Sequence, residues 1–151
     1  KHKPIDNCII AFSFTPESIS KLIEHKVPSV EKRITTMKKL ADAGWKLGLR
    51  FDPIIPACNF AKIYENLFKD IAFNISKESV HSISFGMMRF PKKMLKKMIR
   101  ENPDKKISSL NLENRNGIYS YPKEMEKKIE NIVIKKLKKY MKDVPIYNCK
   151  V

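Results

Sequence analysis

Polar and charged side chains stand at the ends of three apolar segments, where they are placed to bind a ligand. These residues are Ser13 and Thr15 after the first segment, Arg50, Asp52 and Asn59 after the second, and Gly86, Met87, Met88 and Arg89 after the third. If the segments are parallel strands, their carboxyl ends share one edge of a sheet, and in β/α barrels that edge carries the functional groups. Each residue also has a structural interpretation. Ser13 and Thr15 suit helix caps, Asp52 suits an ion pair with Arg50 or Arg89, and the methionines suit the core.

The histidines and cysteines show no spacing typical of a metal site, a disulfide framework or a catalytic triad. The chain has three histidines and three cysteines, namely His2, His25, His81, Cys8, Cys58 and Cys149. Cys58 is the thiol best placed for a radical or nucleophilic role, although a lone cysteine is more often a packing residue. With four glycines there is also no phosphate-binding loop. Any catalysis therefore needs a group supplied from elsewhere. The odd cysteine count favours a reducing compartment, which we expect to be the cytoplasm.

The elements that position these residues are predicted to alternate between strand and helix. Strands are expected at 8–14, 46–55 and 82–88, and each is followed by an amphipathic segment. The helices are predicted to begin at the Thr15 cap, the Ser29 cap, Asn59, Pro91 and Pro122. Residues 104–120 are polar and are predicted to form a loop, and 145–149 a short terminal strand.

This alternation is the pattern of parallel βαβ units with right-handed crossovers. Three parallel strands leave two open edges, and strands this apolar need both faces covered. We therefore expect a missing partner or missing sequence. The start at Lys1, without an initiator Met, agrees with that expectation.

The charge balance is strongly basic, with a net charge of +15 in 151 residues. Such an excess favours polyanions such as nucleic acid or an acidic membrane surface. Lysines scattered along helices in a lysine-rich proteome would give the same excess without such a partner. No apolar run approaches the ~18 residues of a membrane span, so we expect no membrane partner.

At the strand ends the sequence resembles spore photoproduct lyase and its radical S-adenosylmethionine (SAM) relatives. Blocks similar to those of the family occur in the family's order at 11–17, 28–34, 39–48, 50–55, 64–68, 83–86, 89–90 and 117–121. The strongest is Arg50-Phe51-Asp52-Pro53-Ile54-Ile55, which is similar to the family's Arg-Phe-x-Pro-Ile strand. The family's Cys-x-x-x-Cys-x-x-Cys motif has no counterpart in this chain.

The resemblance implies the C-terminal half of a partial (β/α) barrel over 1–103, with an extension over 104–151. In such enzymes a reduced [4Fe-4S] cluster and SAM give a 5′-deoxyadenosyl radical that reverses a thymine-dimer lesion in DNA. By the same likeness, Ser13 and Asp52 are expected to contact SAM. Asp52 departs from the Ala that is frequent in the family, and it would bind a ribose or amine of SAM or pair structurally with Arg50.

The expected substrate residues are Arg89, Arg115, Tyr119 and Tyr121, because aromatic rings stack on extruded bases and Arg neutralises phosphate. Here Arg115 lacks the family's following Tyr, and Ile118 replaces a Lys. The implied partners are damaged DNA, the N-terminal half of the barrel with the cluster ligands, and an electron donor. Two alternatives stay open, a divergent radical-SAM enzyme with another substrate and a basic nucleic-acid-binding remnant without catalysis.

Overall fold

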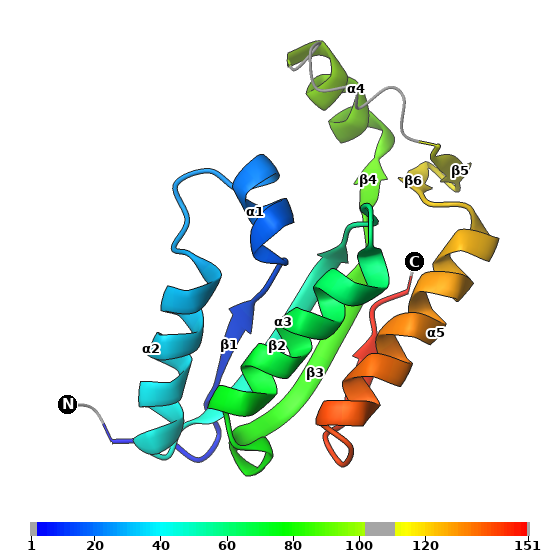
Figure 1. Ribbon diagram of the computed structural model, residues 1–151. Helices are drawn as coiled ribbons and strands as arrows, with labels where there is room; N and C mark the ends of the chain where they lie inside the picture. Colours follow the sequence, from blue (N-terminus) through cyan, green and yellow to red (C-terminus); the bar gives the residue numbers. More distant parts are fainter. Residues whose placement is uncertain (1–2, 102–110, 151) are drawn as a thin grey trace.

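The centre of the molecule is a parallel sheet of four strands (Figure 1). The computed structural model describes residues 3–101 and 111–150. The strands are β1 (Ile9–Ser13), β2 (Lys46–Ile54), β3 (Val80–Met87) and β7 (Ile146–Asn148), in the spatial order β1-β2-β3-β7. The predicted α/β fold with parallel strands is confirmed. The predicted terminal strand is the fourth strand of this sheet, so the described sheet has one strand more than the three predicted from the apolar segments.

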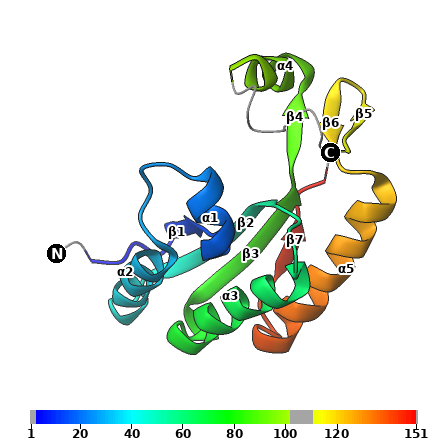
Figure 2. The same ribbon diagram turned by 45° about the horizontal axis from the view of Figure 1, so that its top comes forward.

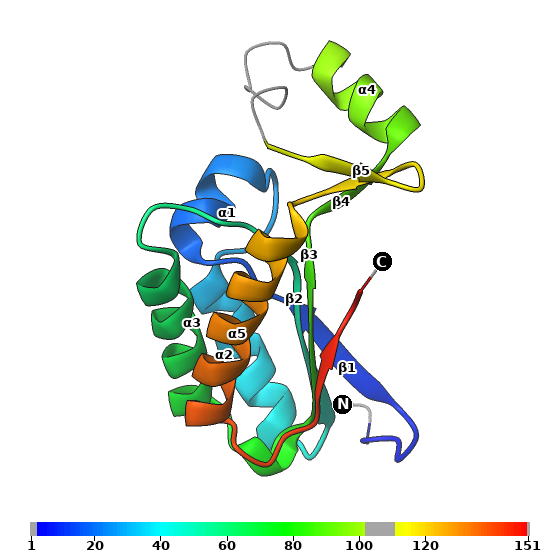
Figure 3. The same cartoon turned by 90° about the vertical axis from the view of Figure 1, so that its right-hand side faces the viewer.

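The helices beside this sheet lie on one of its faces (Figure 3). They are α1 (Glu17–Ile23), α2 (Val30–Asp42), α3 (Phe60–Asn74) and α5 (Lys123–Tyr140), and a short 3-10 turn, Lys77–Ser79, precedes β3. Strands in chain order with helices on one side form an arc of a β/α barrel, because a doubly wound sheet has helices on both faces.

The core lies between this sheet and the helices. Alternate residues of the two central strands point into it and are at most 1% exposed, namely Leu47, Leu49, Phe51, Ile83 and Phe85. The ring of Phe51 meets that of Phe68 of α3 edge to face, with centroids 4.9 Å apart. The remaining residues of the strands therefore point to the other face of the sheet.

A second, smaller sheet stands beyond the carboxyl end of β3 (Figures 1 and 2). It contains β4 (Arg89–Pro91), β6 (Ile118–Ser120) and β5 (Glu113–Arg115), all antiparallel, and α4 (Lys92–Glu101) follows β4 directly. The predicted loop over 104–120 was therefore wrong for its described part, because 113–120 forms a hairpin. The predicted boundary between 103 and 104 lies outside the described residues.

The predicted helix starts have mixed outcomes. Ser29 caps α2 as predicted, because its Oγ accepts a hydrogen bond of 3.2 Å from the Lys32 amide. Thr15 does not cap α1, whose N-cap is Pro16 and has no side-chain cap bond. Regular pairing of β2 ends near Pro53 as predicted, with a register shift between Phe51 and Ile54.

Candidate functional site

The face of the parallel sheet that points away from the helices is polar and has small side chains near its middle. We call it the open face and define it by the in-register residues Ala11, Ser13, Gly48, Arg50, Ser82, Ser84 and Tyr147. The guanidinium of Arg50 lies over Gly48, where an added Cβ would be 3.2 Å from Arg50 Nη2. No carboxylate among the described residues pairs with Arg50. The open face therefore carries one half-buried cation, Arg50, surrounded by small and polar side chains.

An ion pair between Asp52 and Arg89 crosses the carboxyl end of this face. Arg89 Nη2 donates to Asp52 Oδ2 at 2.7 Å, and Arg89 Nη1 donates to the carbonyls of Met87 at 3.3 Å and Cys149 at 3.1 Å. The two side chains are 32% and 29% exposed. Of the two partners predicted for Asp52, the structure gives Arg89. The pair holds the ends of β2 and β3 and the segment after β7 together, and it leaves Asp52 Oδ1 without a bond to Arg89.

Gly86 lies directly beneath this pair. A Cβ at this position would be 2.5 Å from Arg89 Nη1 and 2.9 Å from Asp52 Oδ2, which is closer than van der Waals contact permits. Only glycine therefore lets the pair lie flat against the sheet. Gly86 is predicted from the sequence to lie at the end of the third strand. It contributes to the site because it has no side chain.

Ser13 is exposed at the end of β1, next to Arg50 in the register. Its carbonyl accepts a hydrogen bond of 2.9 Å from Arg33 Nη1, and Arg33 Nη2 also pairs with Glu24. Burial raises the pKa of Glu24, but hydrogen bonds from Ser20, Arg33 and Thr15 outweigh it and the net pKa is lowered. These contacts fix the turn after β1, so the backbone that carries the Ser13 hydroxyl is held in place.

Arg115, predicted to contact DNA, is held by protein groups. Its Nη1 and Nη2 donate to the two oxygens of Glu126 at 2.9 and 2.5 Å, and Nη2 also donates to the Tyr121 carbonyl at 3.1 Å. Burial raises the pKa of Glu126, but hydrogen bonds from Arg115 and Ser120 outweigh it and the pKa is lowered. Arg115 therefore anchors the β5–β6 hairpin to the start of α5.

The two predicted tyrosines differ in accessibility. Tyr119 is half-buried on β6, opposite Phe90 of β4. Tyr121 is 4% exposed, and its hydroxyl lies 3.8 Å from the sulfur of Met88. Burial raises the pKa of Tyr121 above its usual range. Tyr119 is therefore only partly covered, whereas the ring of Tyr121 belongs to the core.

A cavity of about 190 Å³ lies between the ends of β3 and β7 and the first turns of α5. Arg89 and Arg115 contribute to its walls, and the other lining residues are Met87, Ser120, Lys123, Glu126, Lys127, Glu130, Asn148, Cys149 and Lys150. The α5 residues of this cavity are not among those predicted from the sequence. The strand-end rule points to this region once 145–149 is taken as a strand, because Cys149 and Lys150 follow its carboxyl end.

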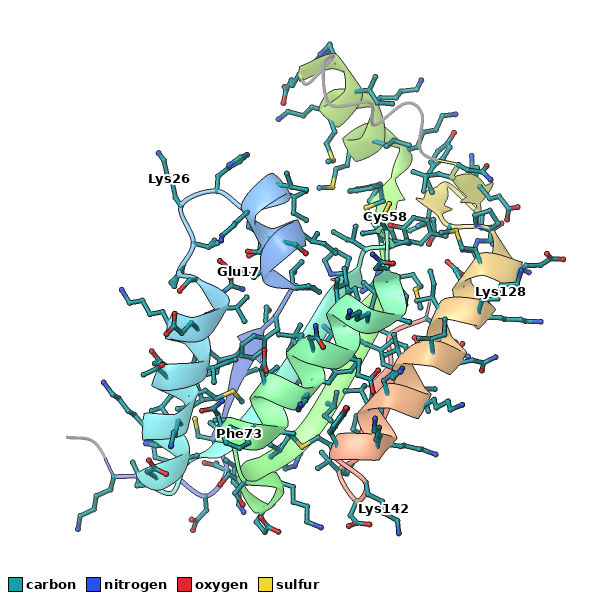
Figure 4. The ribbon with its side chains drawn as sticks, in the orientation of Figure 1. Glu17, Lys26, Cys58, Phe73, Lys128 and Lys142 are labelled. Carbon is teal, nitrogen blue, oxygen red and sulfur yellow. The ribbon has the colours of Figure 1, made fainter. Side chains whose placement is uncertain are left out.

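Cysteines and other metal-binding side chains do not gather in the described part of the chain. No three His, Cys, Asp or Glu residues within 3–101 and 111–150 form a possible metal site. Cys58 is exposed in the turn between β2 and α3 (Figure 4). The described residues therefore do not fit the ligand set of an iron–sulfur cluster.

Within 3–101 and 111–150, no helix is both long and apolar enough to span a bilayer.

The chain is similar to solved structures of spore photoproduct lyase. One, complexed with dinucleoside spore photoproduct, has 20% identity and a TM-score of 0.77 over 92% of this chain and 44% of its own length. A cysteine-to-alanine variant has 19% identity and a TM-score of 0.80 over the same shares. A double variant with bound AdoMet and the dinucleoside has 20% identity and a TM-score of 0.77, over 91% and 43%.

This chain thus spans less than half the length of these structures, and at such identity the likeness concerns the fold. No curated protein matches it. The family model described as spore photoproduct lyase matches residues 2–148, which is almost the whole chain. From its sequence and its fold together, the chain belongs to the spore photoproduct lyase family.

Proposed function

We propose that this chain forms the C-terminal half of a radical-SAM barrel that repairs a thymine-dimer lesion in DNA. The observation that carries the proposal is the open face. Its polar groups and the Asp52–Arg89 pair lie at the carboxyl ends of parallel strands, and the described helices beside the sheet cover only the opposite face. In β/α barrels this face is the barrel interior, and its carboxyl end is where ligands bind.

SAM is the cofactor that the site supports. Together with a reduced [4Fe-4S] cluster, SAM would supply a 5′-deoxyadenosyl radical. Within this chain, the Ser13 hydroxyl and Asp52 Oδ1, which accepts no hydrogen bond from Arg89, would bind the polar groups of SAM. Arg89 orients Asp52 from the other side, and Gly86 leaves room for both. A carboxylate held in this way accepts hydrogen bonds from ribose hydroxyls or an ammonium group.

The cluster ligands would come from the N-terminal half of the barrel, since the described residues offer none. An electron donor would reduce the cluster from outside this half. β1 has a free edge in the sheet order, and strands of that half would pair there. The chain alone would then bind ligands without generating a radical.

The lesion would lie between the open face and the small sheet. Of the two predicted tyrosines, Tyr119 is the one that would stack on a base, because it is half-buried on β6 whereas Tyr121 is buried. Arg89 sits between the two sheets and is 32% exposed; Asp52 and two backbone carbonyls take three of its five N–H donors, and the others would contact a phosphate or base edge. Arg115 would act by holding the hairpin, since Glu126 occupies its guanidinium, and Tyr121 by filling the core beneath it.

The activity is tested with the intact protein, obtained with its upstream reading frame. We expect anaerobic incubation with SAM, a reductant and dinucleoside spore photoproduct to yield 5′-deoxyadenosine and the repaired thymine dinucleotide. If SAM is not cleaved and the upstream sequence has no three-cysteine motif, the proposed enzymatic activity is refuted, and a basic nucleic-acid-binding protein is the remaining candidate.

A divergent radical-SAM enzyme is the second candidate, because Arg115 is engaged by Glu126 and Tyr121 is buried. For that enzyme, SAM cleavage without thymine release is expected.

The role of the Asp52–Arg89 pair is tested by Gly86→Ala, whose methyl group must displace the two side-chain ends. We expect SAM affinity, measured by calorimetry on the intact protein, to fall by about tenfold, the equivalent of one hydrogen bond of about 1.4 kcal/mol. Gly48→Ala is the matched control, because it adds the same methyl group to the same face but crowds Arg50 instead. Equal decreases in both variants would refute a specific role for the pair.

A further inference from the structure

Helix α4 carries an unusual concentration of positive charge. Five of its ten residues are cationic, and its one acidic residue is the last, Glu101. All five cations are exposed, and we call them the α4 basic face, made up of Lys92, Lys93, Lys96, Lys97 and Arg100. At 3.6 residues per turn they fall within an arc of about 140°. The charge is thus concentrated on one side of the helix.

The opposite side of α4 attaches it to the small sheet. Leu95 is buried, and the Lys92 amide donates a hydrogen bond of 3.0 Å to the carbonyl of Gly117 in the hairpin turn. β4, which leads into α4, pairs with β6 of the same hairpin. The position of the basic face is therefore fixed relative to Tyr119.

Little within the described protein neutralises this face. Lys97 and Arg100 reach Glu101 at 4.0 and 3.8 Å, at the limit of an ion pair. No described carboxylate pairs with the other three lysines. Exposed pairs of this kind contribute little and are screened by salt, so the face keeps nearly its whole charge for an external anion.

We propose that the α4 basic face binds the phosphate backbone of duplex DNA beside the lesion, which rests on the proposed function. α4 extends the carboxyl-end side of the molecule beyond the hairpin (Figures 1 and 2). Its length of about 15 Å matches a stretch of DNA that carries about nine phosphate charges. DNA is favoured over a lipid surface because Leu95, in the middle of the helix, is buried against the protein, which leaves only Met94 (51%) and Ile99 (36%) exposed on the apolar side of α4, whereas a bilayer-binding helix needs a continuous apolar face.

The test compares two variants of equal charge. In the first, Lys92, Lys93, Lys96 and Lys97 are changed to Gln, which keeps helix propensity. In the control, the exposed residues Lys128, Lys135, Lys138 and Lys142 are changed to Gln; Lys128 and Lys142 are labelled in Figure 4, on the α5 side away from α4. Binding of a fluorescent DNA duplex is measured by anisotropy over a range of salt concentrations, and circular dichroism verifies folding.

We expect the affinity of the α4 variant to fall at least about tenfold at 0.1 M salt. The slope of log K against log salt should become shallower by about 0.9 for each phosphate that the variant no longer neutralises. The affinity of the control should fall less than about threefold. Equal decreases in the two variants would overturn the proposal, because net charge alone would then explain binding. A stronger decrease in binding to anionic phosphatidylserine vesicles than to DNA would also overturn it, in favour of lipid.

The dinucleoside spore photoproduct separates this proposal from the proposed function. It lacks the flanking duplex whose phosphates the basic face would bind, so the intact α4 variant should bind and repair it as the unchanged protein does. If the unchanged protein repairs the dinucleoside and the α4 variant binds duplex normally, the α4 proposal fails and the enzyme stands. If neither protein repairs the dinucleoside or binds duplex, both fail.

Discussion

At the level of single residues, the buried hydroxyl of Tyr64 shows how a core side chain positions the site. Tyr64 is 1% exposed, and its oxygen accepts a hydrogen bond of 2.9 Å from the Ile55 amide, just after β2 ends. Burial raises the pKa of Tyr64 to about 12. The hydroxyl therefore stays neutral at physiological pH and fixes the chain three residues after Asp52.

Tyr64→Phe should destabilise the protein by about 1–3 kcal/mol, because it leaves the Ile55 amide without an acceptor. Urea unfolding followed by circular dichroism measures the change. Tyr147→Phe is the control, since Tyr147 is 59% exposed, and it should change the free energy of unfolding by less than about 0.5 kcal/mol. Equal effects in both variants would show that the Ile55 contact contributes nothing.

The Arg115–Glu126 pair should show strong coupling in a double-mutant cycle. The two side chains are 25% and 21% exposed, so removing either one leaves the other as a partly buried charge without its partner. Arg115→Met and Glu126→Met should each destabilise the protein, and the double variant should be more stable than the sum of the single effects predicts, by about 0.5–3 kcal/mol. Additive effects would contradict the anchoring role assigned to Arg115.

At the level of elements, a cluster of charges joins α3 to α5. Glu65 of α3 accepts from Lys139 at 2.8 Å and from the Tyr140 hydroxyl at 3.1 Å, and it also pairs with Lys136. Hydrogen bonds from Lys136 and Lys139 lower the pKa of Glu65 from 4.5 to about 2. A carboxylate with a lowered pKa stabilises the folded state above its ordinary pKa, and that stabilisation disappears as the pH falls from about 4.5 toward 2.

Glu65→Gln should therefore flatten the fall in thermal midpoint between pH 4.5 and pH 2, measured by calorimetry in low salt. Glu31→Gln is the control, because Glu31 is exposed near the start of α2 and has no ion pair among those found in the described residues. High salt should reduce the difference between the Glu65 variant and the unchanged protein. A steeper pH dependence in the variant would contradict the assigned pKa.

The longer elements could be predicted from sequence because their apolar periodicity extends over nine or more residues or is bounded by clear caps. The hairpin was missed because β5 and β6 have three residues each and almost no apolar alternation. Its signal was the dipeptide Asn116-Gly117, whose positive φ angles of 51° and 84° form the turn. The prediction of Thr15 as a cap is wrong because it rests on the hydroxyl alone, whereas tertiary packing buries Thr15.

The sequence predicted where the site residues lie, but it did not predict which of their side chains form ion pairs with one another. Strand ends follow from the pattern, whereas the choice between Arg50 and Arg89 as the partner of Asp52 depends on the turn between β3 and β4. Likewise, nothing local links Arg115 to Glu126, since the pairing needs the hairpin to fold back on α5. Long-range contacts of this kind are set by tertiary structure.

At the level of the whole molecule, the sheet has a free edge at β1. The Phe14 amide bonds to the Arg50 carbonyl, so by strand alternation the Phe12 amide also faces β2 and the Ala11 amide faces the free edge. Ile9 beside this edge is 40% exposed, and a free strand edge of this kind can pair with a strand of another chain. We therefore expect this chain, studied by itself, to associate at β1.

Ala11→Pro should therefore shift this chain toward the monomer in sedimentation velocity without unfolding it, because proline removes an amide that points outward. Phe12→Pro is the matched control, and it should unfold the protein because it removes a bond to β2. Unchanged association in the Ala11 variant would show that chains do not meet at this edge.

The order of the strands also bears on how the protein is made. β2 and β3 each lie beside the strand translated just before them, and β7 lies beside β3. A nascent chain leaving the ribosome can thus add each strand and helix to a neighbour that has already been translated, and few contacts between segments distant in sequence have to form. β7 is the exception in timing, because it can pair with β3 only after the small sheet and α5 have been translated between them.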